Sequence, residues 1–291
     1  MRNIFKICSY LFLSFTMLFS LTGCNKEVSN IEKLTVAVSI VPEETFVKAV
    51  AGDLIEVVTM IPPGNSPENY APSPRELQML TKSSIYFSIG VPTEKANILP
   101  KLSSINENIQ VVPLELEVSK VYKDREFSPG KRDPHIWLSP KRVKVMTEII
   151  KDKLCEIDPK NKEIYEKNAK EYMSKIDGLD HDVKNSIKDL PKKGFLVYHP
   201  AFGYFADDYG LKMIAIEKNG KEATIEDIKR IIDYAKKEDI KTLFYQAEID
   251  SKQSRVIAEE IEGSTQAIAP LAPDYIKNIE NMAKTFIKSL K

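Results

Sequence analysis

Residues 158–190 read DPKNKEIYEKNAKEYMSKIDGLDHDVKNSIKDL, and this stretch decides how the chain is organised. Asp158 and Pro159 open it, its apolar side chains keep to one helical face, and Pro191 stops it. We predict one helix of about 45 Å, because each helical residue advances the axis by 1.5 Å. A charged coiled coil is the alternative, which the absence of a strict heptad repeat disfavours.

Before this helix, apolar strand patterns alternate with helical ones. One helix start is especially clear, because Ser73 can cap it, Pro74 fits its first position and Glu76 completes a capping box. The predicted strands are 34–40, 54–61, 84–89 and 109–114, and the predicted helices are 43–50, 73–82 and 139–157.

After the long helix the alternation resumes, with strands expected at 194–198, 211–216, 241–246 and 265–269 and helices at 201–209, 224–238, 251–262 and 274–290. This order predicts an α/β fold of two lobes, each with a mostly parallel sheet, joined by one long backbone helix. The expected domains are an N-terminal βα lobe at 34–157, a linking helix at 158–190 and a C-terminal βα lobe at 191–291.

The N-terminus has the pattern of a secretory signal. Arg2 and Lys6 precede an apolar run over residues 7–21, which is shorter than the roughly 20 residues of a membrane span. Leu21-Thr22-Gly23-Cys24 resembles a lipobox, which implies cleavage before Cys24 and attachment of lipid to its sulfur. We therefore expect a signal peptide at 1–23, a tether at 24–33 and a protein lipid-anchored to the outer face of the cell membrane. An uncleaved N-terminal anchor is the alternative.

The composition excludes some classes of function. The chain has 42 basic and 42 acidic residues among 291, whereas a nucleic-acid-binding protein would need a basic stripe. Of the three cysteines, Cys8 lies in the signal and Cys24 in the lipobox, so Cys155 has no partner for a disulfide. Its helical pattern predicts that it is a small buried residue.

Two of the three histidines stand beside prolines in loops, in Asp133-Pro134-His135-Ile136-Trp137 and Val197-Tyr198-His199-Pro200. Proline restricts the backbone that carries each ring, and a neutral imidazole is a good metal ligand. Ligands of open α/β sheets bind outside the carboxyl ends of the strands, which is where Glu68, His135 and His199 fall. Gln246 and Glu248 follow another strand in the same way.

Imidazole nitrogen and carboxylate oxygen together suit zinc or manganese. Each ligand histidine also needs an acceptor for its second ring N–H, and the nearest carboxylates by position are Asp133, Asp207 and Glu217. His181, between two aspartates in the middle of the long helix, is predicted to be a solvated surface residue.

At these residues the chain resembles the cluster A-I metal-binding lipoproteins of ABC transporters, the ZnuA/TroA type. The similarity covers essentially all of residues 34–291, and its most specific motifs are Pro62-Pro63-Gly64, Pro67-Glu68-Asn69-Tyr70-Ala71-Pro72-Ser73-Pro74, Asp133 to Pro140, His199 to Phe205 and Pro270-Leu271-Ala272. The resemblance implies metal ligands at Glu68, His135 and His199, and a rigid interdomain helix.

The chain departs from this family in three places. The family usually has histidine at the position of Glu68 and a carboxylate at the position of Ala269, and many zinc receptors carry a histidine-rich loop that residues 118–132 lack. The fourth ligand therefore stays open between water, Gln246 and Glu248. Zinc is favoured over manganese as the transported ion.

The function that the resemblance implies is that of a receptor, not an enzyme, which binds the ion between its lobes and delivers it to an ABC permease. We expect a monomer. The alternatives are an adhesin-type surface lipoprotein, a siderophore or haem receptor, and a metallohydrolase, although the chain has no His-Glu-x-x-His motif.

Overall fold

The computed structural model describes residues 33–218, 221–248 and 252–291. The expected signal peptide at 1–23, most of the tether and the lipidation site Cys24 lie outside the described residues. Among the helices that are described, none combines the length and the apolar character that a membrane span requires.

The first sheet has four parallel strands in the order β2-β1-β3-β4. Its strands carry β-branched and aromatic residues, and those of β1 and β3 are almost wholly buried, as expected for a parallel sheet covered on both faces. The strands are β1 (Leu34–Val38), β2 (Ile55–Thr59), β3 (Ile85–Ser88) and β4 (Gln110–Pro113). Its helices are α2 (Val41–Ala51), α3 (Pro74–Leu80), α4 (Leu102–Ile105), α5 (Leu114–Ser119) and α6 (Pro140–Ile157).

The second sheet repeats this arrangement with four parallel strands in the order β10-β9-β7-β8. The strands are β7 (Gly194–Val197), β8 (Lys212–Ala215), β9 (Thr242–Gln246) and β10 (Ser264–Ile268), and the helices are α8 (Gly203–Tyr209), α9 (Ile225–Lys237), α10 (Lys252–Glu260) and α11 (Tyr275–Ser289). The α/β fold predicted from the sequence, with two parallel sheets and one long helix, is confirmed.

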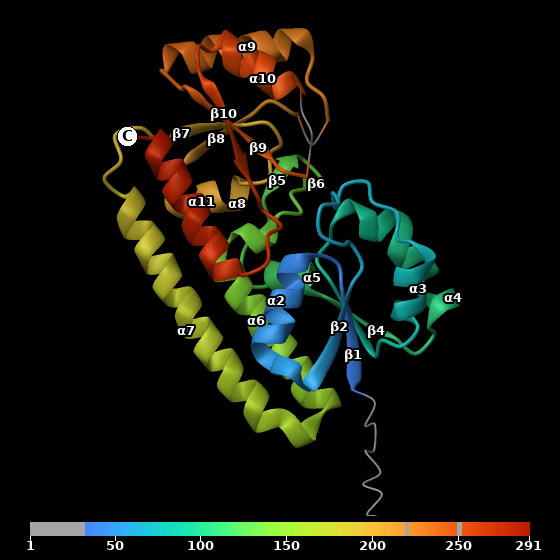
Figure 1. The fold of residues 1–291 in the computed structure, drawn as a ribbon. Coiled ribbons are helices and arrows are strands. Elements are labelled where there is room, and N and C mark those ends of the chain that lie inside the picture. The colour runs from blue at the N-terminus through green and yellow to red at the C-terminus, as the bar shows by residue number, and fades with distance from the viewer. Residues whose placement is uncertain (1–32, 219–220, 249–251) are drawn as a thin grey trace, which may run out of the picture. The chain divides into compact units, whose positions relative to one another are not determined.

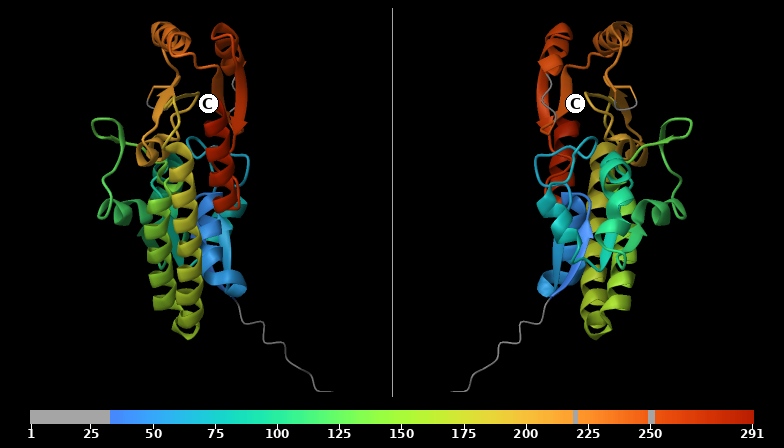
Figure 2. Two further views of the ribbon diagram at one scale, coloured as in Figure 1. Left: turned by 90° about the vertical axis from the view of Figure 1, so that its left-hand side faces the viewer. Right: turned by 90° about the vertical axis from the view of Figure 1, so that its right-hand side faces the viewer.

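The long helix α7 (Lys162–Ile187) packs against α2 and α6 of the first sheet and against α11 of the second (Figure 1). Both views in Figure 2 show α6 and α7 side by side over their lengths. The α-helix is shorter than the predicted span of 158–190. Pro159–Asn161 form a 3-10 turn ahead of it, and the chain leaves the helix after Ile187.

One apolar core runs through both sheets. Val36 of β1, Ile176 of α7 and Phe286 of α11 belong to the same cluster of buried side chains. Direct contacts join the two halves, because the rings of Phe46 and Tyr275 lie 5.1 Å apart. Such continuous packing resists a wide hinge motion between the sheets.

The structure also contains elements that the sequence pattern did not predict. β5 (Glu126–Ser128) and β6 (Lys131–Arg132) form an antiparallel hairpin, and Glu94–Ile98 form a π-helical turn after β3. The predicted strand 109–114 ends at Pro113, where α5 begins at once. Cys155, expected to be buried, is half-buried beside the core.

Candidate metal centre

Glu68 lies in the loop that joins β2 to α3, and the loop is fixed from two sides. The capping box predicted at Ser73 is present and starts α3. The carbonyl of Pro67 accepts from the backbone N–H of Thr93 at 3.0 Å, and that of Tyr70 accepts from Asn97 Nδ2 at 2.7 Å. Glu68 itself is half-buried, with 29% of its side chain exposed.

His135 is held by Asp133, two residues before it. Asp133 Oδ1 accepts from the backbone N–H of His135 at 3.0 Å and lies 2.8 Å from its Nδ1. Both residues are buried, and Arg125 Nε lies 3.6 Å from Asp133 Oδ2, close enough to offset its charge. Tyr204 donates to the carbonyl of Asp133 at 3.1 Å. Burial raises the pKa of Tyr204 to about 12, so its hydroxyl remains a donor.

His199 follows β7 and is held by a different carboxylate. Glu217, just beyond β8, places Oε2 2.6 Å from Nδ1 of His199. Parallel strands β7 and β8 are neighbours in the sheet, so the residues that follow them emerge at the same edge. His199 is buried, as His135 is.

The three predicted ligands meet at one point, with one ligand atom of each within 4.8 Å of the others. Nε2 of His135 and Nε2 of His199 are 3.3 Å apart, and Glu68 Oε1 lies 3.9 Å from each. Both Nδ1 atoms face carboxylates, which accept hydrogen bonds, so the contacts favour the tautomer with the proton on Nδ1 and the lone pair on Nε2. Two lone pairs and a carboxylate oxygen thus converge, an arrangement that a cation stabilises.

Two of the three predicted orienting carboxylates, Asp133 and Glu217, contact the rings as expected. Asp207 does not, because its α8 position directs it to Arg125, whose Nε is 3.6 Å away. His181 is exposed on α7, where its ring pairs with Asn185 at 2.8 Å, as the sequence indicated. The sequence analysis gave no role to Arg125 or Tyr204. The one available signal was that Tyr204 belongs to the motif that begins at His199.

The structure places Glu248, one candidate for the fourth ligand, outside the cluster of three. In the part of the chain that the structure describes, Glu68, His135 and His199 form the one cluster of acidic, histidine or cysteine side chains close enough to share an ion, and Glu248 is not among them. Glu248 Oε2 and Gln246 Nε2 are both buried without a hydrogen-bond partner among the described residues. Burial raises the pKa of Glu248, so its charged form is disfavoured until it is paired.

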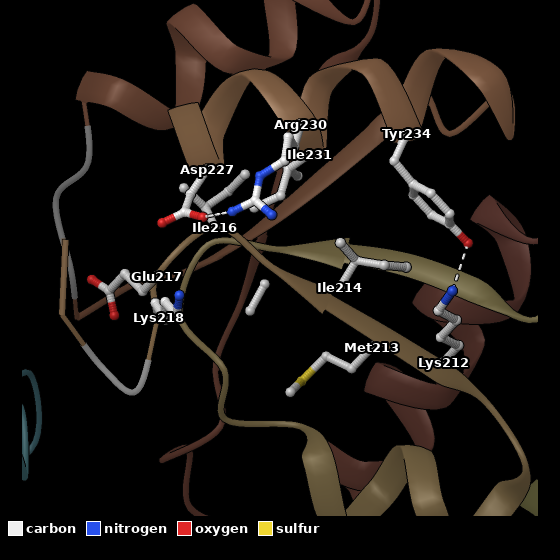
Figure 3. Close-up of a pocket in the computed structure, with 11 residues that line it drawn as sticks. Lys212, Met213, Ile214, Ile216, Glu217, Lys218, Asp227, Arg230, Ile231 and Tyr234 are labelled. Carbon is white, nitrogen blue, oxygen red and sulfur yellow. Dashed lines mark hydrogen bonds and ion pairs between the residues drawn. The ribbon is translucent and has the colours of Figure 1, made fainter. Parts of the chain in front are cut away.

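Two cavities are lined by residues of the candidate metal centre or by the carboxylate that contacts it. One, of about 540 Å³, is lined by Glu68 and His199 together with residues of the β5–β6 hairpin and the turn after β3. The other, of about 430 Å³, lies between β8 and α9 (Figure 3). Glu217 lines this second cavity while it also bonds to His199, and Arg230 on α9 pairs with Asp227.

Comparison with known proteins gives a consistent result. The family model of the zinc-uptake complex component A, periplasmic, matches residues 36–289. The chain is 29% identical over 261 residues to the manganese ABC transporter substrate-binding lipoprotein PsaA of Streptococcus mitis, covering 86% of this chain and 84% of that one. It is 29% identical over 252 residues to the high-affinity zinc uptake system protein ZnuA of Bacillus subtilis, covering 82% and 79% respectively.

A solved structure of a ZnuA superposes on this chain with a TM-score of 0.84 at 32% identity, covering 89% of this chain and all of the other. The relatives thus include proteins named for zinc and a protein named for manganese.

Proposed function

The chain belongs to the zinc-uptake complex component A family, and we propose that it binds a divalent transition metal through Glu68, His135 and His199 and delivers it to an ABC permease. We further propose that Cys24 carries a lipid that holds the protein at the outer face of the cell membrane. Its role is to capture and hand over an ion, with no bond chemistry of its own.

The observation that carries the metal site is the approach of the two imidazole Nε2 atoms to 3.3 Å. In the tautomer with the proton on Nδ1 of both rings, two lone pairs face each other, and this pair is repulsive until a cation lies near both. Burial increases this effect, since water cannot solvate the lone pairs. The site is thus prepared for an ion before one arrives.

The charges around the site match a divalent ion. Glu68 contributes one negative charge directly, and Asp133 and Glu217 contribute theirs through the imidazole rings that they contact. Arg125 offsets part of the charge of Asp133. A buried dication is therefore close to neutralised by the chain's own groups.

Zinc is the ion that we favour. Two imidazoles and one carboxylate leave one position for a fourth ligand in a tetrahedral site, which is the usual zinc geometry. Manganese is typically bound by more oxygen atoms. The support for zinc is thus the donor set, because the named relatives divide between the two metals.

The test is a competition titration of chelator-treated protein with zinc and with manganese, followed by elemental analysis. We expect one ion per chain, tighter binding of zinc, and loss of binding in His135→Ala. Tight binding of an ion by His135→Ala and His199→Ala alike would overturn the assignment of the site. Stronger retention of manganese would overturn the choice of metal alone.

A further inference from the structure

The cavity of about 540 Å³ beside the candidate metal centre has an unusual lining. Besides Glu68 and His199 it is lined by Lys95, Lys131 and Arg132, so three cationic side chains face one carboxylate. Lys95 comes from the turn after β3, and the other two come from the β5–β6 hairpin. A cavity with this charge pattern favours an anion.

Neighbouring carboxylates offset these cations only in part, since Glu115 interacts electrostatically with Arg132 and Lys95 and no carboxylate among the described residues pairs with Lys131. Neither Lys95 nor Lys131 forms an ion pair within the described ranges 33–218, 221–248 and 252–291. Arg132 Nε lies 3.1 Å from Asp124 Oδ2, yet its Nη2 is buried with no hydrogen-bond partner in the same ranges. A buried guanidinium nitrogen without a protein partner is costly, so this nitrogen is free to donate to an acceptor that enters the cavity.

The lack of a side chain at Gly90 leaves room for this arginine. A Cβ at Gly90 would lie 2.7 Å from Arg132 Nη1, and the φ of +85° is one that other residues rarely adopt. The guanidinium therefore packs directly on the backbone after β3. Arg132 is half-buried in the cavity wall, whereas Lys95 and Lys131 are exposed and can adjust to a ligand.

The coordination at the metal centre points to the same ligand. The described residues place three ligand atoms together, whereas a zinc site commonly has four. Because Glu68 and His199 line the cavity, an anion bound there would lie beside two of the three proposed metal ligands.

We propose that this cavity binds a small polycarboxylate together with the metal. One of its carboxylates completes the coordination of the ion, and the others pair with Lys95, Lys131 and Arg132. The volume is within the usual range for small-molecule sites. The inference rests on the proposed function, and it specifies that the ion is bound as a complex with an organic acid.

The test is equilibrium dialysis of the full chain against labelled citrate, with and without zinc, with the zinc content of each sample measured in parallel. We expect zinc-dependent retention of one citrate per chain. Lys95→Glu combined with Lys131→Glu should weaken it at least tenfold. The control is Lys170→Glu combined with Lys175→Glu, which makes the same charge change on exposed positions of α7 and should retain citrate as the wild type does.

A second readout follows the coordination itself. In the cobalt-loaded protein, citrate should change the visible absorption spectrum if its carboxylate joins the metal, and the change should be lost in the variant at Lys95 and Lys131. Equal citrate retention by metal-free protein or by that variant would overturn the inference, and so would a cobalt spectrum that citrate leaves unchanged. Normal zinc binding without citrate retention would reject this inference alone, whereas a failure to bind zinc would reject the proposed function.

Discussion

Glu217 Oε2 lies 2.6 Å from Nδ1 of His199, although the two residues are 18 positions apart and follow different strands. The contact determines which nitrogen of the ring carries the proton and directs Nε2 toward His135 and Glu68. Asp133 does the same for His135 at 2.8 Å. The orientation of both rings is thus built into the fold.

Removal of the Glu217 carboxylate should therefore weaken metal binding without removing a ligand. We expect Glu217→Ala to lower zinc affinity about 10- to 100-fold, as measured by competition with a chelator of known affinity. Glu217→Gln should have a smaller effect, because its amide oxygen can still accept from Nδ1. The control is Glu222→Gln at an exposed position. Unchanged affinity in Glu217→Ala would show that the contact does not orient the ligand.

Zinc should stabilise the folded protein in a manner that depends on His199. At a concentration of 100 times the dissociation constant, a ligand specific to the folded state adds about 2.7 kcal/mol, which raises the melting temperature of a protein of this size by several degrees. His199→Ala should abolish most of this shift in a thermal unfolding experiment. His181→Ala, on the exposed face of α7, should retain it. A full shift in His199→Ala would contradict the assignment.

The single tryptophan should report on the metal centre. Trp137 is buried with its ring 5.1 Å from that of His135, and its Nε1 donates to the carbonyl of Pro270 at 3.1 Å. A cation at His135 changes the field at the indole, so emission should change on addition of zinc and saturate at one equivalent. The change should disappear in His135→Ala. A signal that keeps growing far beyond one equivalent would indicate binding elsewhere.

Glu94 should make the stability of the metal-free protein depend on pH. Burial raises the pKa of Glu94 to about 7, from 4.5. The folded state therefore holds this proton where the unfolded state loses it, and the associated stability is present below pH 4.5 and is lost as pH rises through 7. The loss is roughly 3 kcal/mol, and burial raises the pKa of Glu43 in the same direction.

Urea unfolding between pH 5 and pH 8 measures this effect. Glu94→Gln should flatten the decline, although its amide would face the N–H of Gly90 and should lower stability overall. The exposed substitution Glu107→Gln should leave the slope as it is. If Glu94→Gln and wild type declined in parallel, another group would be responsible.

Gly90 and Gly210 both have positive φ, yet their replacement by alanine should differ in cost. Gly210 ends α8 with open space around it, so Gly210→Ala should cost about 1 to 2 kcal/mol, from backbone strain alone. At Gly90 a Cβ would also meet Arg132 and Glu115 at 2.7 and 2.9 Å. Gly90→Ala should therefore destabilise the protein more strongly, as measured by urea unfolding. Equal costs would mean that the Arg132 side chain moves aside freely.

Much of this molecule was predictable because its signals are local. The capping box at Ser73 and Glu76 marked the start of α3, and the apolar runs marked all eight strands of the two parallel sheets. Glu68 and His199 follow β2 and β7, at the carboxyl edges of the two sheets. His135 was marked by its proline-flanked motif and by the family resemblance, since α5 and the β5–β6 hairpin separate it from β4. Whether they hold an ion stays a prediction.

The remainder depends on contacts between distant parts of the chain. Asp207 was expected beside a histidine, but its position on α8 places it near Arg125 instead. Arg125 directly precedes β5 and is far from Asp207 in the sequence, so no local pattern predicts the contact. The β5–β6 hairpin has strands of three and two residues, too short to give a periodic pattern. The packing of Arg132 on Gly90 joins residues 42 positions apart, and no local motif announces it.

Phe286 of α11 gathers the rings of Phe195, Phe202, Phe205 and Phe244, at centroid distances of 4.5 to 5.6 Å. These partners are all made before α11 during synthesis, so their common centre is the last of them to arrive. A nascent chain that ends before Phe286 lacks the ring that these four phenylalanine side chains contact. Such a chain should stay sensitive to proteases and chaperones until the final helix has emerged and docked.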